Sequence, residues 1–213
     1  MKKLITIILL LFISFSYGQK RELRNANKFY DSGEFSSALD LLESSKVLFD
    51  SSDDKVKSQQ MLLYGKIYTS MQDFSLAMEA FNISKDLGIS SDQLGPELMR
   101  LENSIITNAI ADQESGNSLD AAIKLKMAYD LNPEVNQDYL YFAAGNAVNS
   151  INYSLALEYY LLLRDINYDG VTTKFYITEV ESGNEIEISS VDEFNLLQKS
   201  NIQEGKLFGG FPV

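Results

Sequence analysis

The chain has 213 residues, of which 45% are hydrophobic, and this composition indicates a folded protein of one domain. Its formal net charge of −12 argues against nucleic acid and anionic membrane surfaces as partners. The sequence has no cysteine and no histidine, which excludes disulfides, thiolate chemistry, lipid attachment through an N-terminal cysteine, histidine metal ligands and Ser-His-Asp triads.

Residues 1–18 have the pattern of an export signal. Two lysines precede the apolar run Leu4–Phe15, and the small residues Ser16 and Gly18 stand at the −3 and −1 positions of a cleavage site before Gln19. The run of 12 residues is shorter than the roughly 20 that a membrane-spanning helix needs. We therefore expect cleavage rather than a lasting membrane anchor, no membrane span afterwards, and a location in the periplasm or outside the cell.

Residues 19–169 are predicted to form a domain of helix pairs. The first pair has a helix over Lys20–Ser32, a turn at Gly33 and a second helix over Phe35–Leu48. Its motifs are Asn25-Ala26-x2-Phe29 and Ala38-x3-Leu42. The polar stretch Asp50–Asp54 follows, and we interpret it as a solvated loop with a helix N-cap rather than as a calcium site, because its spacing matches no EF-hand.

The second pair, Met61–Ile89, is the unit around which the other pairs are arranged. Its motifs are Met61-x2-Tyr64-Gly65-x2-Tyr68 and Ala77-x3-Phe81. The small residues allow two antiparallel helices to approach closely, and Tyr68 and Phe81 fill the space between them. Because one such pair cannot bury its own apolar face, we expect neighbouring pairs on either side.

Two further pairs follow the segment Gly88–Pro96, which we expect to be a connecting loop with Pro96 in the first turn of the next helix. The motifs are Ile105-x2-Asn108-Ala109 and Ala121-x3-Leu125 in the third pair, and Tyr141-x2-Ala144-Gly145-x2-Val148 and Ala156-x3-Tyr160 in the fourth. In the third pair Asp112 stands where an aromatic residue is expected, so this pair is predicted to be the least well packed. The turn of the fourth pair is expected to be one residue shorter than the standard turn.

The helical pattern ends near Asp169. Residues 170–202 predict a β-hairpin, with strands in Thr172–Val180 and Glu185–Ser189, and a short helix opened by the capping box Ser190-x-x-Glu193. Residues 203–213 have no period, and we interpret them as a disordered or truncated tail, with a docking segment as the alternative.

The spacing of the four pairs resembles that of the tetratricopeptide repeat (TPR) family, with Met61 in the family's tryptophan position. The resemblance covers about Lys20–Asp169 and implies an all-α, TPR-like α-solenoid of about four helix pairs, followed here by a C-terminal β-hairpin and short helix. This order of parts is similar to that of exported bacterial TPR proteins. In longer members more repeats follow the hairpin, so the chain resembles an N-terminal portion of such a protein.

In that family the first helix of each pair lines a concave groove that binds peptides or other proteins. The resemblance places four residues of each pair at groove positions: Leu23, Asn27, Tyr30 and Asp31; Leu62, Lys66, Thr69 and Ser70; Ile106, Ile110, Gln113 and Glu114; Phe142, Asn146, Asn149 and Ser150. The resulting surface is polar with an apolar stripe, which could equally be ordinary core packing. Chaperone-binding members clamp a terminal carboxylate with basic and asparagine side chains, but Ile106 and Ile110 occupy the basic positions of the third pair, so we expect no such clamp.

The sequence contains no glycine-rich phosphate loop, no HExxH and no GxSxG motif. Its 30 acidic residues are best explained as solvated helix faces, so we expect no enzyme activity, no metal and no cofactor. The leading hypothesis is a non-enzymatic protein–protein interaction scaffold in the cell envelope. The alternative is a carbohydrate- or solute-binding component of an envelope uptake system, in which Tyr30, Tyr139, Tyr141 and Phe142 stack on a sugar ring. A third possibility is a truncated, partner-dependent piece of a larger protein.

Overall fold

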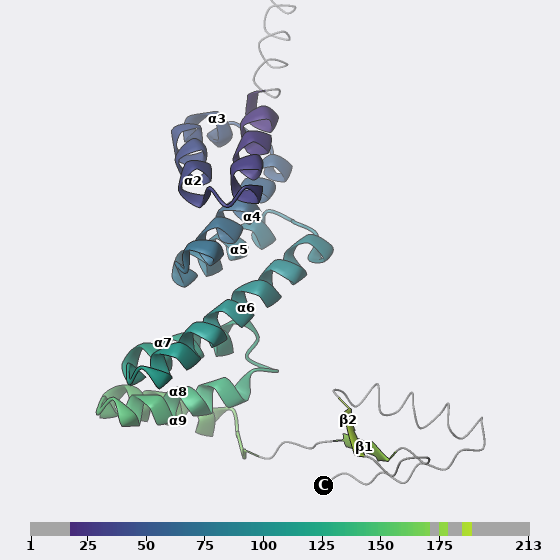
Figure 1. Cartoon of the computed structure of the whole chain (residues 1–213). Coiled ribbons are helices and arrows are strands. Elements are labelled where there is room, and N and C mark those ends of the chain that lie inside the picture. The colour runs from purple at the N-terminus through teal and green to yellow at the C-terminus, as the bar shows by residue number, and fades with distance from the viewer. Residues whose placement is uncertain (1–17, 171–174, 179–184, 189–213) are drawn as a thin grey trace, which may run out of the picture. The chain divides into compact units, whose positions relative to one another are not determined.

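The computed structural model describes residues 18–170, 175–178 and 185–188 (Figure 1). The chain divides into two compact units, Met1–Tyr168 and Asp169–Val213. The described part of the first unit is all-α and contains nine helices, in which consecutive helices pack as antiparallel pairs. The predicted signal sequence, apart from Gly18, lies outside the described residues. No helix in the described ranges is long and apolar enough to cross a membrane.

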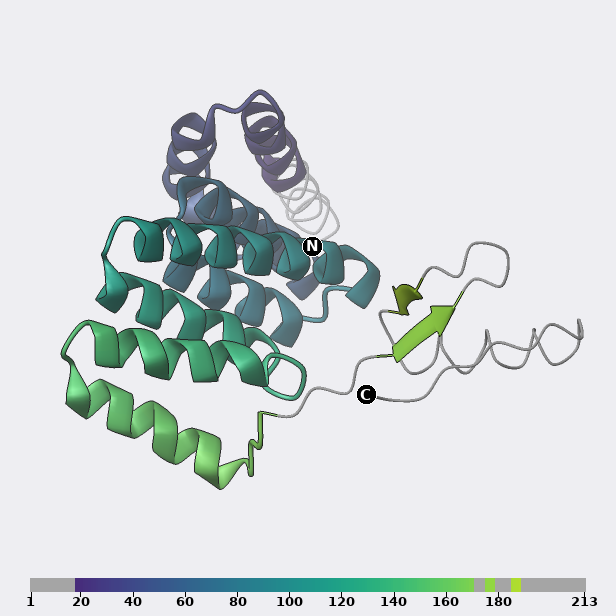
Figure 2. The same ribbon diagram turned by 60° about the horizontal axis from the view of Figure 1, so that its bottom comes forward.

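The N-terminal helix covers residues 18–31. The helices that follow are α2 (Phe35–Ser44), α3 (Lys46–Asp50), α4 (Asp54–Met71), α5 (Phe74–Asp86), α6 (Ser91–Glu114), α7 (Ser118–Leu131), α8 (Gln137–Asn149) and α9 (Tyr153–Asp165). Figure 2 shows α6, α7, α8 and α9 side by side in the order of the sequence. From α4 to α9, each helix therefore packs mainly against a neighbour in the chain.

Small residues set the close approach of the paired helices. Ala77 is fully buried in α5, and a Cβ atom placed on Gly65 of α4 would lie 2.3 Å from the Phe81 ring. The predicted role of Phe81 as the filler between these two helices is thus confirmed. Buried side chains form three successive clusters, the first under the N-terminal helix and α2–α5, the second from α4 to α7 and the third from the end of α6 to α9.

Two predicted boundaries are wrong. The helix expected over Phe35–Leu48 is broken at Ser45 into α2 and α3, and at the break the Ser44 hydroxyl donates to the Leu41 carbonyl. The segment Gly88–Pro96 is a loop only in its first residues, because α6 already begins at Ser91.

The early start of α6 has an identifiable cause. Ser90 is extended (φ −70°, ψ 146°), and its hydroxyl donates to Oε1 of Gln93 at 3.1 Å. Leu94 is buried in the second cluster and anchors the first turn against α4 and α5. Pro96 therefore lies inside the helix, where the burial of Leu94 offsets the loss of one backbone hydrogen bond.

Polar side chains decide the outcome at two places where the sequence made a local prediction, the N-cap before α4 and the missing aromatic residue of the third pair. Asp53 caps α4, since its Oδ1 accepts from the Val56 amide at 2.8 Å, and this confirms the N-cap expected in the polar loop. At the position where an aromatic residue was missing, Asp112 forms an ion pair with Lys124 of α7. This pair bridges α6 and α7 where a ring would otherwise fill the space.

The turns inside the four helix pairs share one backbone geometry. Gly33, Gln72, Gly116 and Ile151 all have a left-handed φ, of 79°, 65°, 81° and 62°. Each stands two residues before its second helix, which begins at Phe35, Phe74, Ser118 and Tyr153. The fourth turn is therefore no shorter than the others, and the expectation of a shorter turn is wrong.

This geometry also shifts the alignment of the fourth pair. Counting back seven residues from the left-handed position gives Ala26, Gly65, Ala109 and, in α8, Ala144. Ala144 is fully buried, whereas a Cβ atom on Gly145 would meet nothing within 4 Å. The small packing residue of the fourth pair is thus Ala144, and each groove position predicted in α8 moves back by one residue.

In the second unit, β1 (Phe175–Thr178) and β2 (Glu185–Ile188) pair as antiparallel strands, with Phe175 opposite Ile188. These strands fall within the predicted hairpin. Its turn, the short helix after Ser190 and the tail 203–213 lie outside the described residues.

Candidate functional site on the first helices of the pairs

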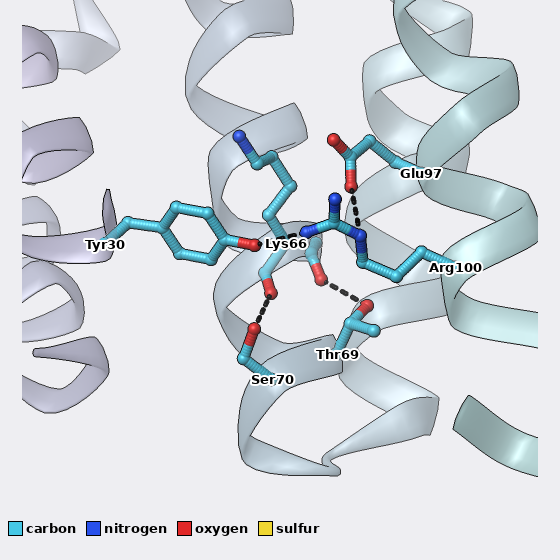
Figure 3. A network of polar contacts seen from close by, with 7 residues as sticks. Tyr30, Lys66, Thr69, Ser70, Glu97 and Arg100 are labelled. Carbon is cyan, nitrogen blue, oxygen red and sulfur yellow. Dashed lines mark hydrogen bonds and ion pairs between the residues drawn. The ribbon is translucent and has the colours of Figure 1, made fainter. Parts of the chain in front are cut away.

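Tyr30 is the point at which the predicted groove residues of the first two pairs meet. The Lys66 ammonium of α4 lies 4.5 Å from the centroid of the Tyr30 ring. Nη1 of Arg100 in α6 donates to the Tyr30 hydroxyl at 3.0 Å (Figure 3). Three first helices, namely the N-terminal helix, α4 and α6, thus contribute one residue each. We call Tyr30, Lys66 and Arg100 the cationic site.

Glu97 fixes the guanidinium of Arg100 from the other side. Nε of Arg100 lies 3.6 Å from Oε2 of Glu97, and the Glu97 side chain is only 15% exposed (Figure 3). The Arg100 side chain is 57% exposed, so its guanidinium is held in place but remains open to solvent. A carboxylate could approach this guanidinium and accept two parallel hydrogen bonds.

Sequence reasoning missed Arg100 because it placed this part of the chain just after a loop. The spacing of Leu94, Leu98, Leu101 and Ile105, at intervals of four, three and four residues, was a helical signal that reached back beyond Pro96. With α6 starting at Ser91, Arg100 lies about 9 Å along the helix from Ile106, at a rise of 1.5 Å per residue. Its side chain reaches Tyr30 of the first pair, beyond the adjacent second pair.

Four predicted groove residues are buried, and Tyr30 is one of them. Thr69 donates to the Gly65 carbonyl at 2.7 Å, and Leu62 belongs to the second core cluster. Asn146 is 4% exposed and donates through Nδ2 to the Phe142 carbonyl, while its Oδ1 has no hydrogen-bond partner among the described residues. The partly buried Leu23 and Ile106 also pack against core clusters. Leu23, Leu62 and Ile106 of the apolar stripe are therefore core packing. Ile110 and Phe142 of the same stripe are 49% and 52% exposed.

Polar predicted residues of the first two pairs bond within their own helices. Asn27 donates to the Leu23 carbonyl at 2.9 Å, and Ser70 donates to the Lys66 carbonyl at 3.1 Å (Figure 3). Asn27 and Ser70 therefore support the helices around the cationic site, where Lys66 supplies the charge.

The predicted residues of the third and fourth pairs do not reach the cationic site through any described interaction. Gln113 and Asn149 are exposed near the ends of α6 and α8. Phe142 is 52% exposed and makes an edge contact with Tyr141, at 5.8 Å between ring centroids. Tyr141 also lies 5.9 Å from the Tyr168 ring, so α8 carries a separate aromatic surface.

The four aromatic residues of the carbohydrate hypothesis differ in their exposure to solvent. Tyr30 belongs to the first core cluster and Tyr139 packs against the second and third clusters. Tyr141 and Phe142 remain as the exposed members of the set.

Comparison with known proteins assigns the chain to no family. No family model matches the sequence, and no curated protein matches it.

Proposed function

We propose that this chain is an exported, non-enzymatic TPR-like scaffold of the cell envelope, which binds an acidic peptide or protein segment through the cationic site. The observation that carries the proposal is the convergence of Tyr30, Lys66 and Arg100 from three successive first helices. A surface shared by several pairs suits an extended peptide or a helix better than a small substrate.

Local charge supports an acidic segment as the ligand. An ammonium and a guanidinium flank one tyrosine, and both complement carboxylates. The chain as a whole carries a net charge of −12, which repels acidic partners at long range. Because salt screens charges beyond roughly 10 Å, recognition would depend on these two cations at short range.

The TPR assignment rests on sequence spacing and is supported by the packing of the helices. Consecutive helices pair in antiparallel fashion, and small residues recur at equivalent positions of each pair, at Ala26, Gly65, Ala109 and Ala144. Export rests on the signal pattern in residues 1–18 alone.

Fluorescence anisotropy with labelled acidic decapeptides, and with the same peptides carrying Asn and Gln in place of Asp and Glu, tests this function. We expect the acidic peptides to bind, and Lys66→Ala with Arg100→Ala to weaken binding about tenfold or more. The matched control, Lys85→Ala with Arg164→Ala, removes two exposed cations elsewhere and should leave the affinity unchanged. Equal affinity of the neutral peptides, or of the Lys66/Arg100 variant, would contradict the proposal.

A second candidate function rests on the exposed aromatic surface of α8. Tyr141 and Phe142 are 49% and 52% exposed, and such rings can stack on a sugar face. If the chain binds carbohydrate, calorimetry with envelope glycans should detect a heat of binding. The double variant Tyr141→Ala with Phe142→Ala should lose this heat. No heat with any glycan would exclude this alternative in favour of the peptide.

A further inference from the structure

A cavity lies on the other side of α4 from the cationic site. Its floor includes Tyr64 and Tyr68, and its volume is about 300 Å³. Tyr64 and Lys66 are two residues apart in α4, which places them about 200° apart around the helix axis. We call this cavity the tyrosine pocket, and its argument is independent of the function proposed for the cationic site.

Two stacked aromatic rings line the tyrosine pocket, and Tyr68 is the more exposed of the two. The centroids of Tyr64 and Tyr68 are 5.9 Å apart, and the ring planes are inclined by 18°. The face of an aromatic ring carries partial negative charge, so it attracts cations. Burial, followed by a hydrogen bond to Glu43, raises the pKa of Tyr64, so both hydroxyls stay neutral at pH 7 and the rings act as π surfaces.

Carboxylates surround these rings from two directions. Glu43 of α2 and Asp50 of α3 line one side of the pocket, and Glu79 of α5 lines the other. Lys46 is the opposing charge in the lining, so three negative groups face one positive group. None of the ion pairs in the described part of the chain involves these four side chains. The pocket therefore keeps an excess of negative charge.

Apolar side chains complete the wall formed by α5. Leu76 and Ile83 both line the pocket and remain 45% and 38% exposed, although such residues are usually covered. A ligand that suits the pocket thus needs a positive head group for the rings and carboxylates, and a short hydrocarbon part for this wall.

We infer that the tyrosine pocket binds a small organic cation, an ammonium or guanidinium group on a short apolar stem, between the Tyr64–Tyr68 rings and the carboxylates of Glu43 and Glu79. The volume of about 300 Å³ is at the lower end of the range for small-molecule sites, which fits such a ligand. The cation can be a free metabolite-sized molecule or an arginine side chain of a peptide.

Isothermal titration calorimetry with charged ligands and their neutral isosteres tests the inference and separates the two sources. One arm compares choline with 3,3-dimethylbutan-1-ol, and the other compares acetyl-arginine amide with acetyl-citrulline amide. At low ionic strength we expect at least one cation to bind about tenfold more tightly than its neutral isostere. The arm that shows the difference identifies the kind of cation.

Variants assign the binding to this pocket. We expect Glu43→Gln with Glu79→Gln to weaken the cation's binding about tenfold, and Tyr68→Leu to weaken it by a similar factor. The matched control, Asp40→Asn with Asp86→Asn, removes the same charge from the same two helices outside the pocket and should retain the affinity. Circular dichroism checks that each variant keeps its helix content.

Three results would overturn the inference. They are the absence of binding by either cation, equal binding of cation and neutral isostere in both arms, and equal losses in the Glu43/Glu79 and Asp40/Asp86 variants. The last result would show an effect of net charge alone.

Discussion

Gly65 and Gly145 stand in similar sequence motifs but in different surroundings. At Gly65 an added Cβ atom would overlap the Phe81 ring, whereas at Gly145 it would enter open space. The space between α4 and α5 is therefore set by the absence of a side chain at one residue, while Gly145 contributes only a weak helix former to α8.

We predict opposite effects of alanine at these two glycines. Gly65→Ala should lower the free energy of unfolding by about 1–3 kcal/mol, because Phe81 must leave its position between the helices. Gly145→Ala should raise it by about 0.5–1 kcal/mol, because alanine loses less backbone entropy in a helix. Urea denaturation of both variants measures the difference. A stable Gly65→Ala protein would mean that α4 and α5 do not pack as described.

At the same scale, Arg100 shows how one side chain can define a site. Arg100 donates a hydrogen bond to Tyr30 of the N-terminal helix. It also forms an ion pair with Glu97, which lies three residues earlier in α6. The residue type alone did not mark it, since Arg21 and Arg164 are also exposed and form ion pairs only with the next residue in the chain in the described part of the structure.

At the scale of the elements, the four turns inside the helix pairs require a left-handed residue. Glycine meets this requirement at Gly33 and Gly116 without steric cost, but Ile151 is β-branched and has a φ of 62°. Ile151 is also 73% exposed, so its side chain gains little from burial. The fourth turn thus stores strain that the first and third turns avoid.

We predict that Ile151→Gly stabilises the chain by about 1 kcal/mol. The relief of left-handed strain, on the order of 1–3 kcal/mol, exceeds the added entropy of glycine in the unfolded chain. The reverse change in an equivalent turn, Gly116→Ala, should destabilise by about 1–2 kcal/mol. Thermal unfolding followed by circular dichroism checks both variants. If Ile151→Gly lowers the melting temperature, the turn conformation described here is incorrect.

The element scale also explains why helix boundaries were harder to predict than helix pairs. Pro96 and the preceding polar residues suggested a loop, but the burial of Leu94 against α4 and α5 outweighed the proline. The break at Ser45 falls in a sequence pattern that is helical throughout, and the Leu41 carbonyl still accepts the Ser45 amide there. Propensity alone did not determine either boundary.

At the scale of the whole helical unit, four tyrosines connect stability to alkaline pH. Burial is the largest cause that raises the pKa of Tyr64, Tyr68, Tyr139 and Tyr159 above the ordinary value of 10.0. In the unfolded chain these groups ionise near that ordinary value, so the folded chain holds more protons above it. Their stabilising contribution is complete below pH 10 and is lost as the pH rises through the folded pKa values.

We therefore predict that the free energy of unfolding falls steadily above about pH 10, with each fully protected tyrosine contributing up to about 1.4 kcal/mol per pH unit. Denaturation series between pH 8 and 11, with tyrosinate absorbance as a second readout, measure the fall. Tyr64→Phe should reduce the slope, whereas Tyr153→Phe, at a 65% exposed residue, should not. An unchanged slope in Tyr64→Phe would contradict the prediction.

The sequence by itself determined that the chain is helical, that its helices come in pairs, and which small residues separate α4 from α5. Those features depend on local periodicity and side-chain size, which any stretch of sequence displays. Of the groove positions it selected, Tyr30 and Lys66 meet in one site, although Tyr30 is buried, as are Thr69, Leu62 and Asn146.

The tertiary structure alone decided which residues from different pairs lie together. Arg100 reaches Tyr30 across 70 positions of sequence, and the fourth pair packs through Ala144 rather than Gly145. The tyrosine pocket likewise combines α2, α3, α4 and α5. Such contacts depend on where each helix begins and how neighbouring helices pack, and this long-range packing leaves no periodic signal in the sequence.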